Sequence, residues 1–353
     1  MSGYPIGKVY ASDKKSLTAI DDLLRAEGIR RDKNLEYTCA IYDDEMNIIA
    51  TGSCFGNTLR CLAVSAAHQG EGLMNIVVTH LINYQFERGN THIFLYTKCD
   101  SVKFFQSLSF YEIARIEGQI VFMENQRSGF SRYLQNLTGN APQSHGNPGQ
   151  RIAALVMNAN PFTLGHQYLV EKAAAENDIV HLFMVSEEQS LIPFTVRKKL
   201  IQAGIAHLPN VYCHDSGSYI ISSATFPSYF QEDDNAVIES NALMDLQIFS
   251  QIATVLGIQR RYVGDEPFSR VTSLYNQIMH TKLPELGIEC IVIPRKTSDE
   301  QIISASAVRQ AIKENDFATV HKMVPSTTFD FFMSKAAEPI IQRIQHTDNV
   351  KHY

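Results

Sequence analysis

The stretch RIAALVMNANPFTLGH, residues 151–166, decides the fold of the second half of this 353-residue chain. Residues 151–157 form a mainly apolar run, which is typical of a buried strand. Turn residues follow, and Gly165 and His166 then begin a helical pattern. A strand that leads into a helix N-terminus presents unpaired N–H groups and a partial positive charge, both of which attract phosphate oxygens. The stretch therefore predicts a phosphate-binding junction between a strand and a helix.

Strands and helices continue to alternate beyond this junction. Helical patterns at residues 165–176 and 195–207 separate short runs of strand-forming residues. This alternation predicts a parallel sheet covered by helices on both faces, in which ligands bind at the carboxyl ends of the strands. The second half is therefore expected to be a doubly wound α/β domain. Its predicted strands are residues 152–158, 179–185, 211–214, 261–263 and 290–293.

The first half mixes strands and helices in a different order. Three strand patterns follow one another, and the loop Gln69-Gly70-Glu71-Gly72 then leads into a long amphipathic helix at residues 73–88. This order predicts an α+β domain. The other predicted elements are helices at residues 17–27 and near 101–108, and strands at 36–42, 47–54, 58–65 and 92–97.

A connector joins the two halves. Residues 125–150 are rich in glycine, proline and amide side chains and carry one short apolar patch. That composition predicts a linker with at most one short helix. We therefore expect a first domain at residues 1–128, a linker at 129–149 and a second domain at 150–345.

The composition excludes several classes of protein. Charged residues make up 19% of the chain and the net charge is −6, so a nucleic-acid-binding protein with a broad basic surface is not expected. Any polyanion must be held by local donors. The six cysteines are scattered without a zinc-ligand spacing, which indicates core thiols in a reducing compartment and no metal site. Because we find no signal segment and no run of about 18 apolar residues, we expect a cytoplasmic protein without membrane spans.

The junction supplies the first candidate catalytic residues. His166 lies in the first helical turn, where it would donate a hydrogen bond to an oxygen that gains negative charge. Thr163 offers a hydroxyl in the same turn, and Gly165 lets the backbone approach a ligand closely. Considered alone, this motif also fits an ordinary loop between a strand and a helix.

A later segment, ISASAVR at residues 303–309, repeats the same chemistry. Ser304 and Ser306 offer hydroxyls and amides at a helix start, and Arg309 supplies a forked cation for a leaving pyrophosphate. Considered alone, the segment also fits an N-capped helix with a solvated arginine.

Two further positions are weaker candidates for the same site. Arg197 follows an apolar-proline turn and would reach phosphate, but it also fits a charged helix face. Gly264 and Asp265 end a strand at a place where a carboxylate often meets a nucleotide, but they also fit a simple turn.

The two motifs resemble the (H/T)xGH and ISSTxIR signatures of the nucleotidyltransferase superfamily, and they occur in the same order. The resemblance implies a Rossmann-like domain whose first motif contacts the α- and β-phosphates of ATP. It also implies that Asn158, Asn160, Pro161 and Phe162 belong to the ATP site. Ala305 departs from the pattern, because a second serine is usual there.

The loop at residues 69–74 resembles the (Q/R)xxGx(G/A) loop of GNAT-type acetyltransferases, and residues 103–110 resemble their FYxxxGF helix. The resemblance implies a GNAT-like domain in which Gln69, Gly70 and Gly72 hold the phosphate end of a CoA-like arm. Met74 and Ser109 depart from the pattern. Glu71 lies in the loop and His68 directly before it, and neither is an obvious general base. A GNAT-like domain that binds such an arm or a carrier protein, without acetylating amines, fits these departures.

Longer strings resemble the citrate lyase ligase family over nearly the whole chain. The family resemblance implies an ATP-dependent ligase that activates acetate as acetyl-adenylate, with Mg²⁺ carried by ATP. The acetyl group would then pass to the thiol prosthetic group on the acyl carrier subunit of citrate lyase, so the reactive thiol belongs to the partner. The strings are VMNANPFTLGHQYLVEKAA, SYIISSATFPSYF and RRYVGDEPFSRVTSLYN.

Two other functions fit parts of the same pattern. One is adenylyl transfer in cofactor biosynthesis, with phosphopantetheine or nicotinamide mononucleotide as the acceptor. The other is a non-catalytic sensor of nucleotide and acetyl-CoA. The first predicts exchange that depends on phosphopantetheine or nicotinamide mononucleotide and not on acetate. The second predicts nucleotide binding with no AMP release under any acceptor.

Overall fold

The computed structural model describes residues 4–32, 34–140, 149–186, 190–220, 234–265, 270–294, 297–298 and 301–350. The chain divides into two compact units, one of residues 1–132 and 226–247 and the other of residues 133–225 and 248–353. Helix α7 (Asp234–Leu256) therefore has residues in both groups. The domain boundaries that the sequence suggests, at residues 128 and 150, stay a prediction.

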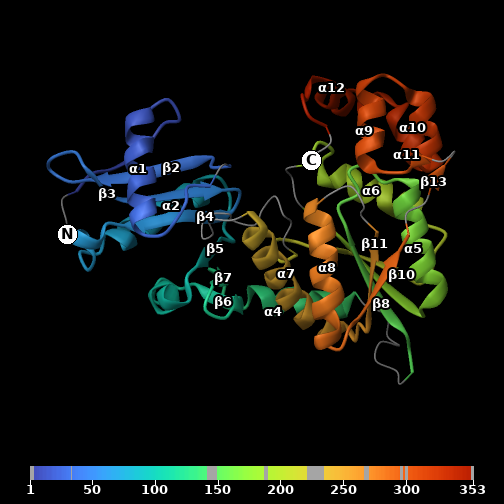
Figure 1. The fold of residues 1–353 in the computed structure, drawn as a ribbon, viewed down its shortest axis with the longest axis horizontal. Helices are drawn as coiled ribbons and strands as arrows, with labels where there is room; N and C mark the ends of the chain where they lie inside the picture. The colour runs from blue at the N-terminus through green and yellow to red at the C-terminus, as the bar shows by residue number, and fades with distance from the viewer. Residues whose placement is uncertain are drawn as a thin grey trace. The chain divides into compact units, whose positions relative to one another are not determined.

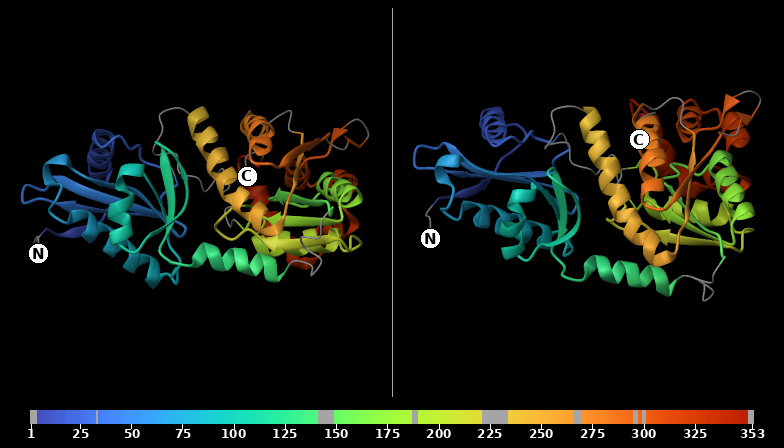
Figure 2. Two further views of the ribbon diagram at one scale, coloured as in Figure 1. Left: turned by 90° about the horizontal axis from the view of Figure 1, so that it is seen from below. Right: turned by 60° about the horizontal axis from the view of Figure 1, so that its bottom comes forward.

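The first unit is built on a seven-stranded sheet with the order β1-β2-β3-β4-β5-β7-β6. Helices α1 (Lys14–Ala26) and α2 (Leu73–Glu87) lie on opposite sides of the sheet (Figure 2). The strands are β1 (Ile6–Lys8), β2 (Tyr37–Tyr42), β3 (Ile48–Phe55), β4 (Thr58–Val64), β5 (Phe94–Thr97), β6 (Tyr111–Ile116) and β7 (Ile120–Glu124), and α3 (Val102–Ser107) follows β5.

One pair of strands in this sheet differs from all the others. Strands β4 and β5 run parallel, whereas every other neighbouring pair in the sheet is antiparallel. Only Thr58 and Leu59 of β4 pair with β5, opposite Phe94 and Leu95. Beyond these two pairs the strands no longer share a ladder, so the sheet is open between their carboxyl ends.

The second unit contains a five-stranded parallel sheet with the order β10-β9-β8-β11-β12. Because β8 is central and later strands add on both sides of it, the sheet is doubly wound, as predicted. The strands are β8 (Ile152–Met157), β9 (Ile179–Met184), β10 (Val211–Asp215), β11 (Arg260–Gly264) and β12 (Glu289–Ile293), and the helices between them include α5 (Leu164–Glu176), α6 (Phe194–Gly204) and α8 (Arg270–Glu285).

Helices cover both faces of this parallel sheet (Figure 1). On one face, Leu155 of β8 packs in a buried core with Val170 of α5 and Leu200 of α6. On the other face, the ring of Phe183 in β9 meets the ring of Phe249 in α7, with 6.5 Å between their centroids. Alternate residues of each strand therefore serve two separate layers of helices.

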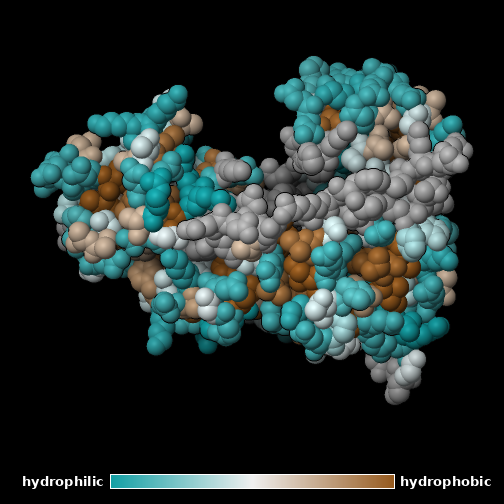
Figure 3. Space-filling view, viewed as in Figure 1, coloured by the Kyte–Doolittle hydropathy of each residue, from teal (hydrophilic) through white to brown (hydrophobic). Residues whose placement is uncertain are grey.

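A group of short helices completes the second unit. Helices α9 to α12 form a further apolar core together with Leu191 and Ile192. Their outer surface is mainly hydrophilic (Figure 3). No helix within the described ranges is long and apolar enough to cross a membrane. The four helices are α9 (Ala305–Lys313), α10 (Phe317–Met323), α11 (Ser326–Phe332) and α12 (Glu338–His346).

The predicted elements are present, and the structure adds five strands to them: β1, β6, β7 and the two-residue strands β13 (Thr297–Ser298) and β14 (Gln301–Ile302), which pair with each other. Strand β1 has only three residues, and β6 and β7 form a hairpin whose turn contains Gly118 with a φ of 71°. Helix α4 (Gly129–Gly139) is the single short helix expected in the connector. The string at residues 218–230 and the end of the connector fall mostly outside the described residues.

Close packing of Gly204 against Phe162 leads to a test of stability. A Cβ atom on Gly204 would lie 2.4 Å from Cε1 of the fully buried Phe162 ring, which leads into α5. We expect Gly204→Ala to lower the free energy of unfolding by about 1–3 kcal/mol, measured in urea. Gly165→Ala is the matched control, because its Cβ would first meet the Ile303 carbonyl oxygen at 3.4 Å, an ordinary contact. Equal stability of the two variants would contradict this packing.

A buried histidine pair is expected to make the second unit sensitive to acid. Nδ1 of His181 lies 2.9 Å from Nε2 of His214, and burial lowers the pKa of His214 to about 4. An unfolded histidine takes up its proton near pH 6.5, so between these values the unfolded state binds more protons than the folded state. The free energy of unfolding should therefore fall as the pH drops below 6.5, by up to about 3 kcal/mol at pH 4.

Urea titrations at pH 7 and pH 5 measure this effect. His214→Gln keeps a hydrogen-bonding group beside His181 and removes the titration, so the difference between the two pH values should shrink by about 2 kcal/mol. His207→Gln provides the control, because the His207 side chain is 53% exposed. If the free energy of unfolding of His214→Gln fell as much between pH 7 and pH 5 as that of the parent protein, His214 would not be the source of the acid sensitivity.

Candidate functional site

The predicted junction forms a capped helix start at the carboxyl end of the central strand β8. Thr163 is the N-cap of α5, and its Oγ1 accepts a hydrogen bond from the backbone N–H of His166 at 3.3 Å. In return, Nδ1 of His166 accepts the backbone N–H of Thr163 at 3.1 Å and lies 2.8 Å from Thr163 Oγ1. The two side chains therefore close a reciprocal capping box that fixes the first turn of the helix.

This capping box also fixes the chemistry of His166. A ring nitrogen that accepts a backbone N–H cannot carry the proton of the neutral ring, so that proton lies on Nε2. The ring of the buried Phe162 stacks against the imidazole, with centroids 5.8 Å apart and an angle of 19° between the planes. His166 is thus held as a hydrogen-bond donor with a fixed ring plane.

A second capped helix start lies beside the first. Ser304 is the N-cap of α9, and its Oγ accepts the backbone N–H of Ala307 at 3.1 Å and lies 3.1 Å from Ser306 Oγ. A Cβ on Gly165 would lie 3.4 Å from the carbonyl oxygen of Ile303. The backbone of the later motif therefore approaches the first turn of α5, and the structure brings the two predicted signatures together.

Arg309 links these two segments from the inside of the protein. Its side chain is 2% exposed, and it donates from Nη1 to the carbonyl oxygen of Asn160 at 2.5 Å and from Nε to that of Val350 at 2.6 Å. Burial lowers the pKa of Arg309 to about 10, so the guanidinium is still cationic at neutral pH. The contacts that the structure gives are those of a positioning residue, and a contact with pyrophosphate stays a prediction.

Arg197 has a similar place on the other side of the loop. Its side chain is fully buried, and Nη1 donates to the carbonyl oxygens of Asn158 and Val185 and to Oδ1 of Asn158, while Nε donates to the carbonyl oxygen of Ile192. These acceptors follow the ends of β8 and β9. Arg197 therefore joins the carboxyl ends of two neighbouring strands, and its predicted contact with phosphate stays untested.

Ser190 is a residue of this site that no sequence motif indicates. It is 6% exposed, and its Oγ lies 3.1 Å from Nδ2 and 3.3 Å from Oδ1 of Asn158. Serine in a loop carries no distinctive spacing, so only the folded chain reveals the contact. Ser190 and Arg197 together hold the Asn158 side chain.

The strand end at Gly264 and Asp265 lies at the same edge of the sheet. The Gly264 carbonyl oxygen accepts from Nδ2 of Asn276 at 3.0 Å, and a Cβ on Gly264 would be 4.0 Å from Leu169 of α5. Asp265 is exposed and its N–H donates to the carbonyl oxygen of Ile293. The pair therefore ends β11 next to α5, and its contact with a nucleotide stays a prediction.

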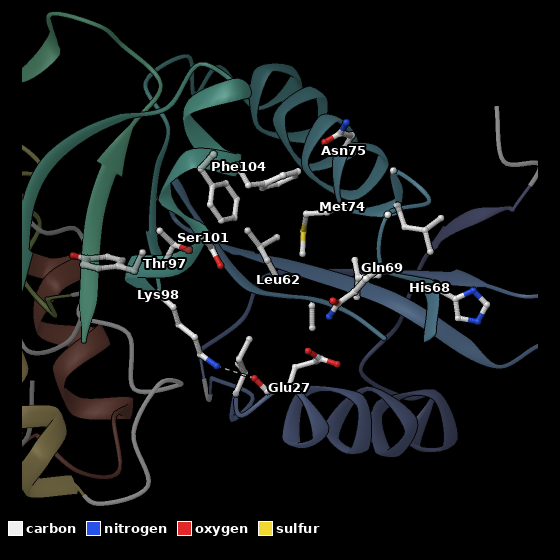
Figure 4. A pocket seen from close by; sticks show the side chains of 18 residues that line it. Glu27, Leu62, His68, Gln69, Met74, Asn75, Thr97, Lys98, Ser101 and Phe104 are labelled. Atoms are coloured by element: carbon white, nitrogen blue, oxygen red, sulfur yellow. Dashed lines mark hydrogen bonds between the residues drawn. The ribbon is translucent and has the colours of Figure 1, made fainter. Parts of the chain in front are cut away.

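The first unit contains a cavity of about 590 Å³ where β4 and β5 separate (Figure 4). Leu62, Ala63 and Val64 line it from β4, and Tyr96 and Thr97 line it from β5. This volume lies in the range of small-ligand sites. The backbone edges of the two separated strands border an apolar slot suited to an extended, amide-containing chain.

The predicted loop residues Gln69, Gly70 and Gly72 line one end of this cavity. Gly70 and Gly72 have φ values of 90° and 77°, and nothing lies within 4 Å of a Cβ built on either. Gly72 is the N-cap of α2 and supplies no side-chain cap, so the first amides of α2 have no such partner. Ser109 stands at a usual glycine position with a φ of 63°, which is the conformation that favours glycine there.

The cavity lining offers few groups for proton transfer. Nδ1 of His68 lies 3.1 Å from Glu71, and Nζ of Lys98 donates to the carbonyl oxygen of Glu27 at 2.9 Å (Figure 4). His68 and Lys98 therefore each have a partner, and the carboxylate of Glu27 is a further titratable group of the lining (Figure 4).

Three of the six thiols are buried and poor nucleophiles. All six cysteines are free, and burial raises the pKa of Cys39, Cys54 and Cys61 to about 12. Within the described residues, no group of three or more His, Cys, Asp or Glu side chains could hold a metal ion.

Family profiles match both units of the chain. The profile described as the citrate lyase ligase C-terminal domain matches residues 152–332, and that of the acetyltransferase (GNAT) family matches residues 9–111. Among solved structures, a putative nicotinate-nucleotide adenylyltransferase from Vibrio parahaemolyticus is 15% identical and covers 56% of this chain and 97% of its own, with a TM-score of 0.35. A putative acyl-CoA N-acyltransferase from Klebsiella pneumoniae is 14% identical and covers 35% and 96%, with a TM-score of 0.29.

Two ligases are similar to nearly the whole chain. The citrate pro-3S-lyase ligase of Escherichia coli (strain K12) is 38% identical over 333 residues, which cover 93% of each chain. The corresponding ligase of Haemophilus influenzae is 36% identical over 91% of this chain and 96% of its own. These matches confirm the predicted family and the enzyme class that it implies: the chain belongs to the citrate lyase ligase family.

Proposed function

We propose that the protein uses ATP to activate acetate as acetyl-adenylate and then acetylates the thiol prosthetic group on the acyl carrier subunit of citrate lyase. AMP and pyrophosphate are the other products. The observation that carries this proposal is the pair of capped helix starts, α5 and α9, that meet at the carboxyl end of β8. Such a pair supplies amides and hydroxyls to a triphosphate without a basic surface.

In the first half-reaction, a carboxylate oxygen of acetate attacks the α-phosphorus of ATP. The new O–P bond forms as the bond between the α-phosphorus and the bridging oxygen breaks, and pyrophosphate leaves with the electron pair. His166 donates from Nε2 to an α-phosphoryl oxygen that gains charge, and Thr163 fixes the donor. Catalysis then consists of alignment and charge stabilisation, and no protein nucleophile is needed.

The remaining predicted residues form the ATP site around this centre. Arg309 and Arg197 hold the loop between β8 and α5 in place, and the charge of Arg309 also favours the leaving pyrophosphate. Mg²⁺ arrives with ATP, held chiefly by phosphate oxygens. The residues assigned to ATP are Asn158, Asn160, Pro161, Phe162, Gly165, Arg197, Gly264, Asp265, Ser304 and Ser306.

In the second half-reaction, the thiol of the carrier subunit attacks the acetyl carbonyl carbon. The C–S bond forms, the C–O bond to AMP breaks, and the thiol proton passes to solvent. The buried, weakly acidic cysteines of the chain support a thiol supplied by the partner. A reducing cytoplasm suits both that thiol and the free cysteines.

The cavity of the first unit is proposed to bind the CoA-like arm of the carrier subunit. Its slot between β4 and β5 fits the amide-bearing part of the arm, and Gln69, Gly70 and Gly72 face its phosphate end. The open loop glycines and the start of α2 support this assignment.

His166→Ala tests the proposed chemistry. Removing one donor to a developing oxyanion lowers the rate by about 10² to 10³, and acetate-dependent exchange between ATP and pyrophosphate measures that loss. His207→Ala is the matched control, since His207 is exposed and pairs with Glu171. Exchange at the parent rate in His166→Ala would refute the role of this residue.

The acceptor distinguishes the alternative functions. AMP formation from ATP should require acetate and the thiol form of citrate lyase. Exchange that depends on phosphopantetheine or nicotinamide mononucleotide instead would identify an adenylyltransferase. Nucleotide binding without AMP formation under any of these conditions would identify a sensor.

A charge change at Gly70 tests the arm site. Asp and Asn have the same shape and tolerate a left-handed backbone similarly, and space for either is open at Gly70. Gly70→Asp should weaken binding of dephospho-CoA to the full chain about fivefold relative to Gly70→Asn, because like charges about 4 Å apart repel by about 1 kcal/mol in water. Calorimetry measures both affinities. Equal affinities of the two variants would show that the phosphate end of dephospho-CoA does not bind at this loop.

A further inference from the structure

The side-chain amide of Asn160 is a buried donor at the centre of the ATP site. Asn160 is 3% exposed, and its Nδ2 has no hydrogen-bond partner among the residues that the structure describes. An unsatisfied buried donor is unfavourable, and in native proteins it calls for an explanation such as a ligand. Its neighbours in the loop, Asn158 and Thr163, both use their side-chain polar groups within the protein.

The orientation of this amide is fixed by its other contacts. Oδ1 of Asn160 accepts the backbone N–H of Ile192 at 3.2 Å, and the Asn160 carbonyl oxygen accepts from Arg309. Turning the amide by 180° would place its NH₂ group against the N–H of Ile192, donor against donor. Ala159, just before it, has a φ of 48°, a costly conformation for alanine that is most often kept at functional sites. The unpartnered NH₂ group is therefore a feature of the loop.

A carboxylate is the ligand that this donor suits best. The helix starts of α5 and α9 supply backbone amides for phosphate oxygens. A nucleophilic carboxylate needs an orienting donor without a full positive charge, because a cation would lower the electron density that attacks phosphorus. A neutral amide meets this need.

We infer that Asn160 binds the carboxylate of the acid substrate, with Nδ2 donating to the oxygen that does not attack. The inference rests on the proposed function with one change: Asn160, assigned there to ATP together with its neighbours in the loop, orients the acid instead of binding ATP. Loss of this donor should therefore raise the KM for acetate while leaving the affinity for ATP nearly unchanged.

The test uses Asn160→Asp in the full chain. Aspartate keeps an acceptor for the Ile192 N–H and replaces the donor by an oxygen that repels a carboxylate. We expect the KM for acetate in ATP–pyrophosphate exchange to rise at least about tenfold. Asn160→Ala, checked by thermal unfolding, removes the donor without adding a charge beside the triphosphate. It should therefore raise the KM for acetate in the same direction and change the Kd of a non-hydrolysable ATP analogue, by calorimetry without acetate, less than about threefold. Asn136→Asp, at an exposed position of α4, is the charge control.

Three results would overturn the inference. A rise in the Kd of the ATP analogue equal to the rise in the KM for acetate would make Asn160 a phosphate ligand. Unchanged constants in both Asn160 variants would mean that a buried water satisfies the amide. A change as large in Asn136→Asp would make the effect one of net charge. Failure of the proposed function is separate, because the parent protein would then show no acetate-dependent exchange.

Discussion

The hydrogen bond from Arg309 to the carbonyl oxygen of Asn160 is the contact on which the arrangement of the site depends. It joins two segments that lie 149 residues apart in the sequence, one in the loop after β8 and the other in α9. A buried guanidinium is costly, and burial lowers the pKa of Arg309 to about 10, a penalty of roughly 3 kcal/mol. The fold retains this cation despite that cost, and the cation connects the two helix starts.

Arg197 extends the same principle to the sheet. Its guanidinium donates to the carbonyl oxygens of Asn158 and Val185, which follow β8 and β9. These oxygens need a hydrogen-bond donor, because the strand ladder ends before them. The chain has few positive charges to spare, since its net charge is −6. Two of them are buried and shape the loop, and in the proposed function the direct contacts with phosphate are left to amides, hydroxyls and His166. A nucleotide can thus be bound by a mildly acidic protein.

Much of this arrangement could be predicted from the sequence, because apolar runs and turn residues report local structure. The strands of the parallel sheet, the long helix after Gly72 and both capped helix starts follow directly from such patterns. The direction of a long side chain depends on contacts distant in sequence, so the buried positions of Arg197 and Arg309 could not be predicted. The hairpin of β6 and β7 is different, because its pairing is local, with Ile116 opposite Ile120 and Gly118 in the turn, so the sequence does carry a signal for it.

The two units use a helix start in opposite ways, and the difference lies in the capping residue. In α5 and α9, the hydroxyls of Thr163 and Ser304 occupy a backbone N–H of the first turn and make the turn rigid. That rigidity suits a site that must align attack on phosphorus, where a small displacement is costly. In α2, Gly72 leaves the first amides without a side-chain cap and keeps the loop open. An uncapped start suits a site that holds a long arm by its phosphate end, because binding there requires donors and space more than exact alignment.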